Sequence, residues 1–287
     1  VLIYGESGTG KELIARAVHE TSPFSEGNFV ALNCSSIPAE LFEGELFGHR
    51  DGAFTGAKRG GRKGLIEEAQ DGVLFLDEIS ELALDQQSKL LRFLQERYYR
   101  PIGSNEEKLA YLKVVAASNK ELKQLVVEGK FRADLFFRIN VFNIHIPPLR
   151  ERPEDISSIA MQKLTRFVSS YQSQFSVADI LSEILEILVS YSWPGNVREL
   201  ENVLERVIAS IQMADDLTKI KEILRDISPE IFSKSTSDIE QTLVKTKELE
   251  LVVEAMHKFD GDKQQVAHYL GLSQTTLWRR LKHINIK

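Results

Sequence analysis

Short apolar runs rich in β-branched residues recur through the first half of the chain, and helical spacing of apolar residues fills the stretches between them. The runs at 1–4, 29–32, 73–76, 112–117 and 141–146 have the length and composition of buried strands. Strands that alternate with helices predict an α/β fold with a mostly parallel sheet covered on both faces. The prolines at 147 and 148 end this pattern, because proline removes a donor that a strand needs.

From residue 154 onward the apolar positions follow the helical period alone. They predict helices near 156–167, 180–191 and 197–211, and therefore a second, all-helical domain. Residues 222–238 mix charges with serine and threonine, as a linker does. We expect an α/β domain at 1–149, a helical domain at 150–212, a linker at 213–238 and an all-α C-terminal domain at 239–287.

The last domain carries a basic helix after a tight turn. The turn Gly271-Leu-Ser273 separates a short helix from a second helix at 274–282, and Ser273 is suited to cap it. The residues after Ser273 include four lysines and arginines and no acid, which favours a helix–turn–helix that lays this helix in the major groove of DNA. A solvated basic cap on a helical unit is the alternative. The candidate DNA contacts are Gln274, Thr275, Thr276, Arg279, Arg280 and Lys282.

Composition narrows the classes of protein. The 287 residues suit two or three domains, and a net charge of −6 argues for a local DNA contact rather than a chain that coats nucleic acid. Cys34 is the only cysteine, so no internal disulfide forms, and we expect a buried thiol in a cytoplasmic protein. No apolar run approaches the roughly 20 residues that span a bilayer, so no membrane partner is expected. The chain begins inside a predicted strand, and we expect it to be a piece of a longer protein.

The first predicted strand runs directly into a glycine-rich turn that ends in a lysine. Glycines let successive backbone N–H groups point inward, the following helix offers its positive end, and Lys11 reaches phosphate oxygens. This pattern predicts ATP binding; a chance glycine-rich turn is the alternative. The turn and its flanking residues are Gly5, Glu6, Ser7, Gly8, Thr9, Gly10, Lys11 and Glu12.

Two carboxylates follow the buried strand at 73–76. A phosphate loop usually ends in a hydroxyl that binds Mg²⁺, but Glu12 stands there, so the metal needs another ligand. Asp77, at the end of a strand, is placed to hold Mg²⁺, and Glu78 to polarise the attacking water. An acidic pair often does no more than open a loop, and it is the phosphate loop upstream that favours the chemical interpretation.

The hexapeptide Gly-Ala-Phe-Thr-Gly-Ala at 52–57, preceded by Glu-Leu-Phe-Gly-His at 45–49, resembles the signature loop of the bacterial enhancer-binding proteins. These are the AAA+ activators of sigma-54 RNA polymerase, and the resemblance extends over the whole chain. It implies an AAA+ P-loop NTPase with a parallel sheet, a helical lid and a C-terminal helix–turn–helix of the Fis type. It also implies that the loop contacts sigma-54 through Gly52, Ala53, Phe54, Thr55, Gly56 and Ala57.

The same resemblance implies a role for each remaining candidate. Lys11 matches the phosphate-loop lysine, Asp77 the Mg²⁺ ligand and Glu78 the catalytic glutamate, and Glu12 is what this family tends to have. Asn33 matches a residue that restrains the glutamate, and Asn119 a sensor after the fourth strand. Arg132 and Arg138 match fingers that reach a neighbouring subunit's γ-phosphate, and Arg198 a lid arginine that faces the nucleotide. Taken singly, each arginine has a surface ion pair as its alternative, and each asparagine a turn.

The implied partners are the sigma-54 RNA polymerase holoenzyme, enhancer DNA and further copies of the chain, from a dimer to a hexameric ring. Pro101 and Ser104 depart from the family's usual Arg and Gly in a second substrate-side loop. The run at 58–67 and the ending at 276–282 resemble the propionate-regulator subgroup. Two rivals stay open: an AAA+ unfoldase or protease partner, which needs no helix–turn–helix, and a DNA-binding repressor that retains the ATPase fold.

Overall fold

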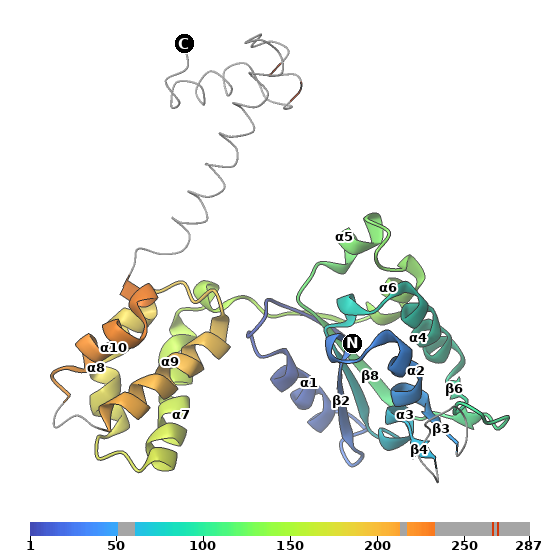
Figure 1. Ribbon diagram of the computed structural model, residues 1–287, viewed down its shortest axis with the longest axis horizontal. Helices are drawn as coiled ribbons and strands as arrows, with labels where there is room; N and C mark the ends of the chain where they lie inside the picture. The colour runs from blue at the N-terminus through green and yellow to red at the C-terminus, as the bar shows by residue number, and fades with distance from the viewer. Residues whose placement is uncertain (51–60, 213–216, 233–265, 267–268, 270–287) are drawn as a thin grey trace.

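The computed structural model describes residues 1–50, 61–212 and 217–232 together with 266 and 269. The predicted sigma-54 contacts at 52–57 and the predicted DNA contacts between 274 and 282 lie outside the described residues. Figure 1 shows an α/β unit that carries the N-terminus and a helical unit that follows it in the chain.

A five-stranded parallel sheet forms the centre of the first unit. The sheet confirms the α/β prediction, and the strands differ from the predicted runs only at their ends. β1 lies between β8 and β9, which places the glycine-rich turn after β1 near the middle of the sheet's carboxyl edge. The strands, in spatial order, are β2 (Phe29–Asn33), β5 (Val73–Asp77), β8 (Lys113–Ser118), β1 (Leu2–Tyr4) and β9 (Asn143–His145).

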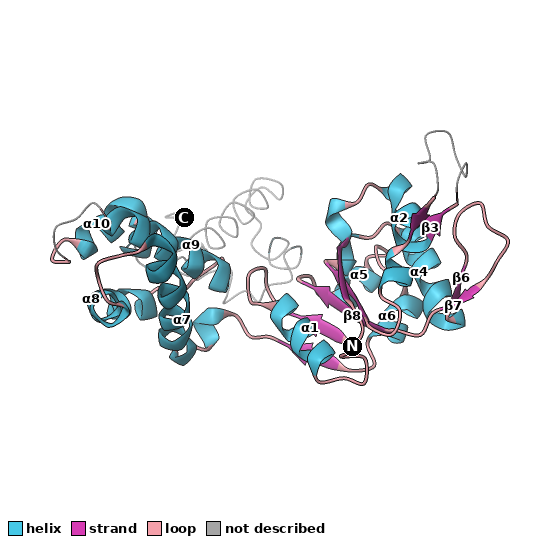
Figure 2. Ribbon diagram, turned by 90° about the horizontal axis from the view of Figure 1, so that it is seen from below, coloured by secondary structure: helices cyan, strands magenta, loops and turns pink. Residues whose placement is uncertain are grey.

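Helices cover both faces of this sheet (Figure 2). Side chains alternate along β5, so Leu74 and Leu76 join one core cluster while Val73 and Phe75 join another. The first cluster includes Phe42, Leu90 and Leu135 from helices on one face, and the second includes Ala15 from α1 on the opposite face. The helices are α1 (Lys11–Glu20), α2 (Ala39–Phe47), α3 (Leu65–Glu68), α4 (Leu84–Glu96), α5 (Leu122–Val127) and α6 (Ala133–Ile139), and the short helices are η1 (Cys34–Ser36) and η2 (Ile79–Glu81).

Two small antiparallel hairpins project from the α/β unit at a distance from the helical unit (Figures 1 and 2). In the first, β3 (Gly48–His49) pairs with β4 (Arg62–Lys63). In the second, β6 (Tyr98–Tyr99) pairs with β7 (Lys108–Leu109). The first hairpin is the stem of the predicted sigma-54 loop.

The second unit is helical, as its period predicts, and has its own core. Trp193 is fully buried there and donates from Nε1 to the carbonyl of Leu188 at 2.7 Å. Ser176 caps α8 by accepting from the amide of Asp179. The elements are η3 (Leu149–Glu151), α7 (Glu154–Tyr171), α8 (Val177–Ser190), α9 (Asn196–Ile211), α10 (Ile220–Ile227) and η4 (Pro229–Phe232).

The linker expected at 213–238 is wrong over residues 220–232, which form α10 and η4. Ile220 and Leu224 lie one turn apart on α10, and both are buried in the core of the second unit together with Ile231. This apolar face packs against α9 and supplies the stability that an exposed, highly charged segment lacks. The charged residues Glu222, Arg225 and Asp226 of α10 are exposed on its outer face.

None of the helices in the described part of the chain is both long enough and apolar enough to cross a membrane.

Candidate nucleotide site

The glycine-rich turn joins the end of β1 to the start of α1 and holds Lys11 in its interior. Lys11 is buried, and its Nζ donates to the carbonyls of Gly5 and Glu6, both at 2.9 Å. Gly10 caps the helix in the left-handed conformation, with φ of 99°. The ammonium and the first amides of α1 therefore face the concave side of one loop, the arrangement that binds phosphate.

Asp77 and Glu78 lie at the carboxyl end of β5, next to Asn33 at the end of β2. Asn33 and Asp77 are partners in the parallel register, and the amide of Glu78 donates to Oδ1 of Asp77 at 2.9 Å. Glu78 adopts φ of 52°, a left-handed conformation that costs free energy for a side chain other than glycine. The chain thus reverses at Glu78 and places its carboxylate at the carboxyl edge rather than along the strand.

The electrostatics join the turn and the acidic pair into one site. Burial lowers the pKa of the Lys11 ammonium, and the carboxylates of Asp77 and Glu78 oppose that shift. Burial likewise raises the pKa of Asp77, with Lys11 opposing the shift. Burial and the same two carboxylates raise the pKa of the Cys34 thiol to about 12, which agrees with the buried thiol predicted from sequence. Lys11, Asp77 and Glu78 therefore act on one another across the carboxyl edge.

Two asparagines lie at this edge, and they differ in exposure and in hydrogen bonding. Asn33 is exposed, and its Oδ1 accepts from the amide of Ser35 at 2.9 Å and from its hydroxyl at 2.7 Å. No hydrogen bond joins Asn33 to Glu78 among the described residues. Oδ1 of Asn119, just past β8, is buried and has no hydrogen-bond partner within the described ranges. A buried acceptor without a donor is costly, so a bound group that donates to it would be stabilised.

The helical unit reaches the glycine-rich turn through polar contacts. Arg150 binds the carboxylate of Glu6 with two hydrogen bonds, of 2.8 and 2.6 Å, and Arg152 donates to the carbonyl of Thr9 at 3.1 Å. Arg198 donates to the hydroxyl of Ser7 at 3.2 Å, which places this predicted site residue beside the turn. A bidentate guanidinium–carboxylate pair fixes direction as well as distance.

Asn196 is the most deeply buried of these connections. Its side chain is 0 % exposed; Nδ2 donates to the Glu6 carboxylate at 3.1 Å and to the carbonyl of Ser7 at 3.0 Å, while Oδ1 accepts from the amide of Leu149 at 2.8 Å. Sequence reasoning did not single out Asn196, Arg150 or Arg152, although Asn196 lies only two residues before the predicted Arg198. One asparagine thus links the turn, the entry to the helical unit and the start of α9.

Replacing Asn196 with alanine is expected to lower the free energy of unfolding by about 1–3 kcal/mol, because three polar groups on two segments lose a hydrogen-bond partner. Urea unfolding followed by the fluorescence of the buried Trp193 measures the loss. Ser182→Ala, which removes an exposed hydroxyl of α8, is the control and should stay within about 0.5 kcal/mol of the parent. Equal stability of the parent and the Asn196 variant would contradict this account.

The two predicted finger arginines lie at the two ends of α6 and contact α4. Arg132 precedes α6 and binds the carboxylate of Asp134 at 2.7 and 3.0 Å, while its Nη1 donates to the hydroxyl of Ser88 at 3.1 Å. Arg138, in the last turn of α6, donates to the carbonyl of Leu94. Within the described part of the chain neither arginine contacts the glycine-rich turn. The structure therefore gathers the other predicted nucleotide-site residues at the carboxyl edge and keeps these two apart.

Residues 1–145, just over half of the chain, match the family described as the Sigma-54 interaction domain. The chain belongs to the sigma-54 interaction domain family. Residues 150–241 match an AAA+ ATPase lid domain, which extends past α10 and η4, and residues 244–283 match a bacterial regulatory protein of the Fis family. These matches confirm the predicted AAA+ fold with a helical lid and a C-terminal helix–turn–helix domain. The propionate-regulator subgroup is not confirmed by them and stays a prediction.

Named relatives agree with this family. Regulatory protein AtoC of Escherichia coli K12 is 42% identical over 293 residues, and nitrogen fixation protein VnfA of Azotobacter vinelandii is 43% identical over 288 residues. Each alignment covers 100% of this chain, but only 62% of AtoC and 54% of VnfA, so the chain spans about half to three-fifths of these relatives. NtrX from Brucella abortus in complex with ATP superposes with a TM-score of 0.66 at 27% identity, covering 99% of this chain and 63% of NtrX.

In this member of the sigma-54 interaction domain family, the stem of the first hairpin is hydrogen-bonded to the loop of the second. The amide of Ile102, in the second hairpin, donates to the carbonyl of Gly48 at 2.9 Å, and the amide of Arg50 donates to the carbonyl of Ile102 at 3.0 Å. Residues 51–60 depart from this stem. A displacement of the second hairpin therefore moves the stem of the predicted sigma-54 loop.

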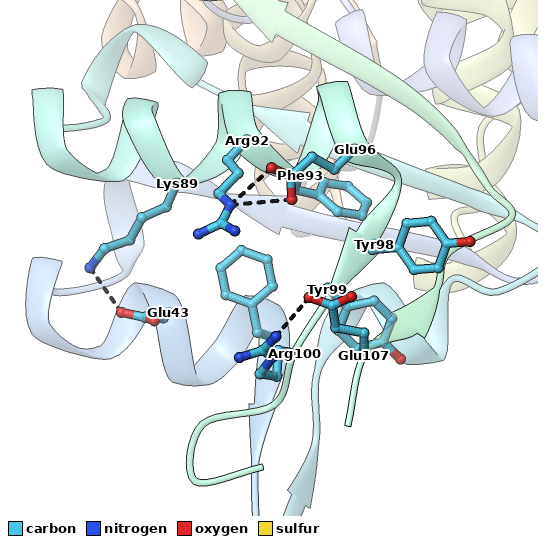
Figure 3. A pocket seen from close by; sticks show the side chains of 10 residues that line it. Glu43, Lys89, Arg92, Phe93, Glu96, Tyr98, Tyr99, Arg100 and Glu107 are labelled. Atoms are coloured by element: carbon cyan, nitrogen blue, oxygen red, sulfur yellow. Dashed lines mark hydrogen bonds and ion pairs between the residues drawn. The ribbon is translucent and has the colours of Figure 1, made fainter. Parts of the chain in front are cut away.

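A groove lies beside the second hairpin, between α2 and α4 (Figure 3). Its charged side chains are paired with one another: Lys89 with Glu43 at 2.8 Å, Arg92 with Glu96 at 3.1 Å, and Arg100 with Glu107 at 2.7 Å. Each charged side chain that lines the groove thus has a partner of opposite charge within it, and the pair of Lys89 with Glu43 joins α4 to α2.

Proposed function

We propose that this chain is the ATPase and DNA-binding portion of a sigma-54-dependent transcriptional activator. ATP hydrolysis between subunits of a ring drives the loop at 52–57 against sigma-54 polymerase and converts the closed promoter complex to the open one. The C-terminal domain holds the ring at upstream enhancer DNA, and the protein works in the cytoplasm. The observation that carries this proposal is the convergence of Lys11, Asp77 and Glu78 on one carboxyl edge, beneath a lid that touches the same glycine-rich turn.

The residues at this edge fit a magnesium nucleotide. Lys11 and the first amides of α1 suit the phosphates, and the unpartnered Oδ1 of Asn119 suits a donor. Asp77 would hold Mg²⁺, which neutralises charge that develops on the phosphates. Glu78 would accept the proton of the attacking water, since the left-handed backbone at that residue turns its side chain away from the line of the strand.

Each site is proposed to be completed by a neighbouring subunit. Arg132 and Arg138 face α4 rather than the turn of their own chain, so they are placed to serve another copy. An arginine supplied in trans is worth a factor of roughly 10³ or more in phosphoryl transfer. The ion pair between Arg132 and Asp134 lies at the surface and would be released at little cost on assembly. Ring assembly would then switch the ATPase on.

The loop at 52–57 is proposed to act on polymerase and not on nucleotide. Thr55→Ala is expected to keep ATP turnover within a few-fold of the parent while reducing open-complex formation at least about 10-fold, because a Phe and a Thr between small residues suit contact with a partner. Single-round transcription with sigma-54 holoenzyme, run beside phosphate release, measures both. Ser25→Ala, in the loop between α1 and β2, is the control. Normal transcription by the Thr55 variant would remove this role and favour an unfoldase or a repressor.

The helix at 274–282 is proposed to read palindromic DNA as one of a two-fold pair, with half-sites about 34 Å apart. Arg280→Ala should weaken binding to every sequence and lower the salt slope by about one, whereas Thr275→Ala should change sequence preference more than salt response. Titrations of specific and scrambled duplexes at several salt concentrations separate the two effects. A salt slope that Arg280→Ala leaves unchanged would place this arginine away from the phosphates.

A further inference from the structure

Gln87 is a fully buried polar side chain on the otherwise apolar face of α4. Its exposed fraction is 0 %, and its neighbours at helical spacing, Leu90, Leu91 and Leu94, belong to the main core cluster. A glutamine in such a place is costly unless its amide is hydrogen-bonded. Because leucine would fill this position without that cost, the bonds that Gln87 makes indicate its role.

The amide of Gln87 binds three backbone groups on two other segments. Nε2 donates to the carbonyl of Leu82 at 2.8 Å and to the carbonyl of Lys130 at 3.0 Å, and Oε1 accepts from the amide of Arg132 at 2.8 Å. Both donor hydrogens and one acceptor site are used, and these bonds fix the direction of the amide plane. The backbone of Arg132 is thereby tied to the middle of the core.

The bond to Arg132 lies at the point where the predicted finger leaves the backbone. Arg132 precedes α6 in an extended conformation, so helical hydrogen bonding does not hold its amide. Gln87 supplies the missing acceptor. At its other end, the bond to Leu82 reaches the segment after η2, four residues past Glu78. The side chain of Gln87 therefore connects two segments: the one that follows Asp77 and Glu78, and the one that leads into Arg132.

We propose that Gln87 is a positioning residue that fixes the backbone of Arg132, so that its guanidinium reaches the nucleotide of the neighbouring subunit. This proposal rests on the proposed shared site. Without Gln87 the amide of Arg132 and the carbonyl of Lys130 lose their common partner, so the backbone of Arg132 can shift even though the amides of Lys130 and Phe131 stay bonded to the carbonyl of Leu125. A displacement of about 1 Å in a catalytic group costs up to roughly 10²-fold in rate.

The test replaces Gln87 with methionine, which keeps the side-chain volume and removes all three hydrogen bonds. We expect ATP turnover of the 287-residue chain to fall about 10- to 100-fold, with nucleotide affinity within about two-fold of the parent. Gln86→Ala is the matched control, since the neighbouring Gln86 is also buried but, within the described part of the chain, bonds only to the amide of Ala83 at the start of α4. It should keep both values near those of the parent. Unchanged turnover in a folded Gln87 variant would overturn the proposal.

Mixed rings distinguish positioning of the finger from general damage. A Gln87→Met subunit keeps its own nucleotide half-site, so mixing it with Lys11→Ala, which supplies an intact finger, should restore turnover. Mixing it with Arg132→Ala should not, because every site then lacks a working finger. The reverse pattern would mean that Gln87 acts on Glu78 through Leu82, and would overturn the assignment. If Arg132→Ala and Lys11→Ala also fail to complement each other, the shared site itself is wrong.

A measurement on the unmodified chain does not depend on any variant folding. The amide of Arg132 should show strong protection in hydrogen exchange, comparable with the interior of α4, because a fully buried oxygen accepts its proton. The amide of the exposed Ala133, next in the chain, serves as the comparison within the same peptide segment. Rapid exchange at Arg132 would contradict the hydrogen bond on which the proposal depends, whatever the outcome for turnover.

Discussion

Replacing Lys11 with alanine is expected to abolish nucleotide binding, whereas Glu78→Gln should bind nucleotide as the parent does and hydrolyse it roughly 10²–10⁴-fold more slowly. The two residues act on different atoms. The buried ammonium of Lys11 faces the phosphates in the ground state, while the carboxylate of Glu78 is needed only when water loses its proton. Calorimetric titration with ADP and steady-state phosphate release measure the two effects separately.

Glu81→Gln is the control for the acidic position. Glu81 lies three residues further along the same chain segment and pairs with Lys120 at the surface, so its loss should change neither affinity nor turnover appreciably. Because Glu78→Gln preserves the size and the left-handed backbone of that position, a change in turnover reports the charge. Equal loss of affinity in the Lys11 and Glu78 variants would contradict the separate roles.

Rings mixed from two inactive variants are expected to regain ATPase activity. Arg132→Ala lacks the finger and Lys11→Ala lacks the phosphate-loop lysine, so each variant alone should lose roughly 10³-fold or more in turnover. In a mixed ring, an intact turn on one subunit meets an intact finger on the next. Phosphate release across a series of mixing ratios should pass through a maximum, with assembly followed by light scattering.

Arg92→Ala serves as the control for the mixing experiment. Arg92 lies on α4 and forms an exposed pair with Glu96 one turn along the helix, so it offers the same change of charge without a catalytic role. Its variant should be active alone and should show no maximum when mixed with the parent. Rings that assemble but give no recovery at any ratio would show that each subunit hydrolyses ATP with its own residues.

Local pattern was sufficient to predict the sheet of the α/β unit. A run such as Val73–Asp77 is apolar on both faces because helices cover both, and this makes a buried strand recognisable without its neighbours. The glycine-rich turn and the acidic pair are likewise local, since each follows directly from the end of a strand. Their meeting at one edge follows from parallel strands, so this part of the site was predictable as well.

The prediction of a linker was wrong because the charged composition of residues 222–238 obscures the helical period of the apolar residues at 220–227. Ile220 and Leu224 are buried on one face of α10, and Ile223 and Ile227 are partly buried beside them. The charged residues between these positions made the segment resemble a linker. An eight-residue helix has little stability alone and forms because α9 offers it a surface. That surface exists only once the lid has folded, so the periodicity of one segment does not reveal it.

Contacts between distant segments account for the site residues that sequence reasoning missed. Asn196 meets Glu6 across 190 positions, and Gln87 meets Arg132 across 45. In sequence, Asn196 reads as a helix start and Gln87 as a polar interruption of an apolar face. Their functions depend on backbone groups brought together by folding, for which no spacing rule exists. A buried amide at an apolar helix position is the one local sign that Gln87 offers.

The turn and the lid touch at Gly8 through backbone atoms. Gly8 has φ of 78°, and a Cβ at this position would lie 2.3 Å from the carbonyl oxygen of Gly195. Any larger residue there would act as a wedge that forces α9 away from the turn, even if it still allowed phosphate to bind. Evolutionary drift at position 8 is thereby restrained twice, by the ligand and by the backbone of the lid, and no substitution at Gly195 would relieve the clash, since a Cβ there would itself lie 2.7 Å from Cβ of Glu199.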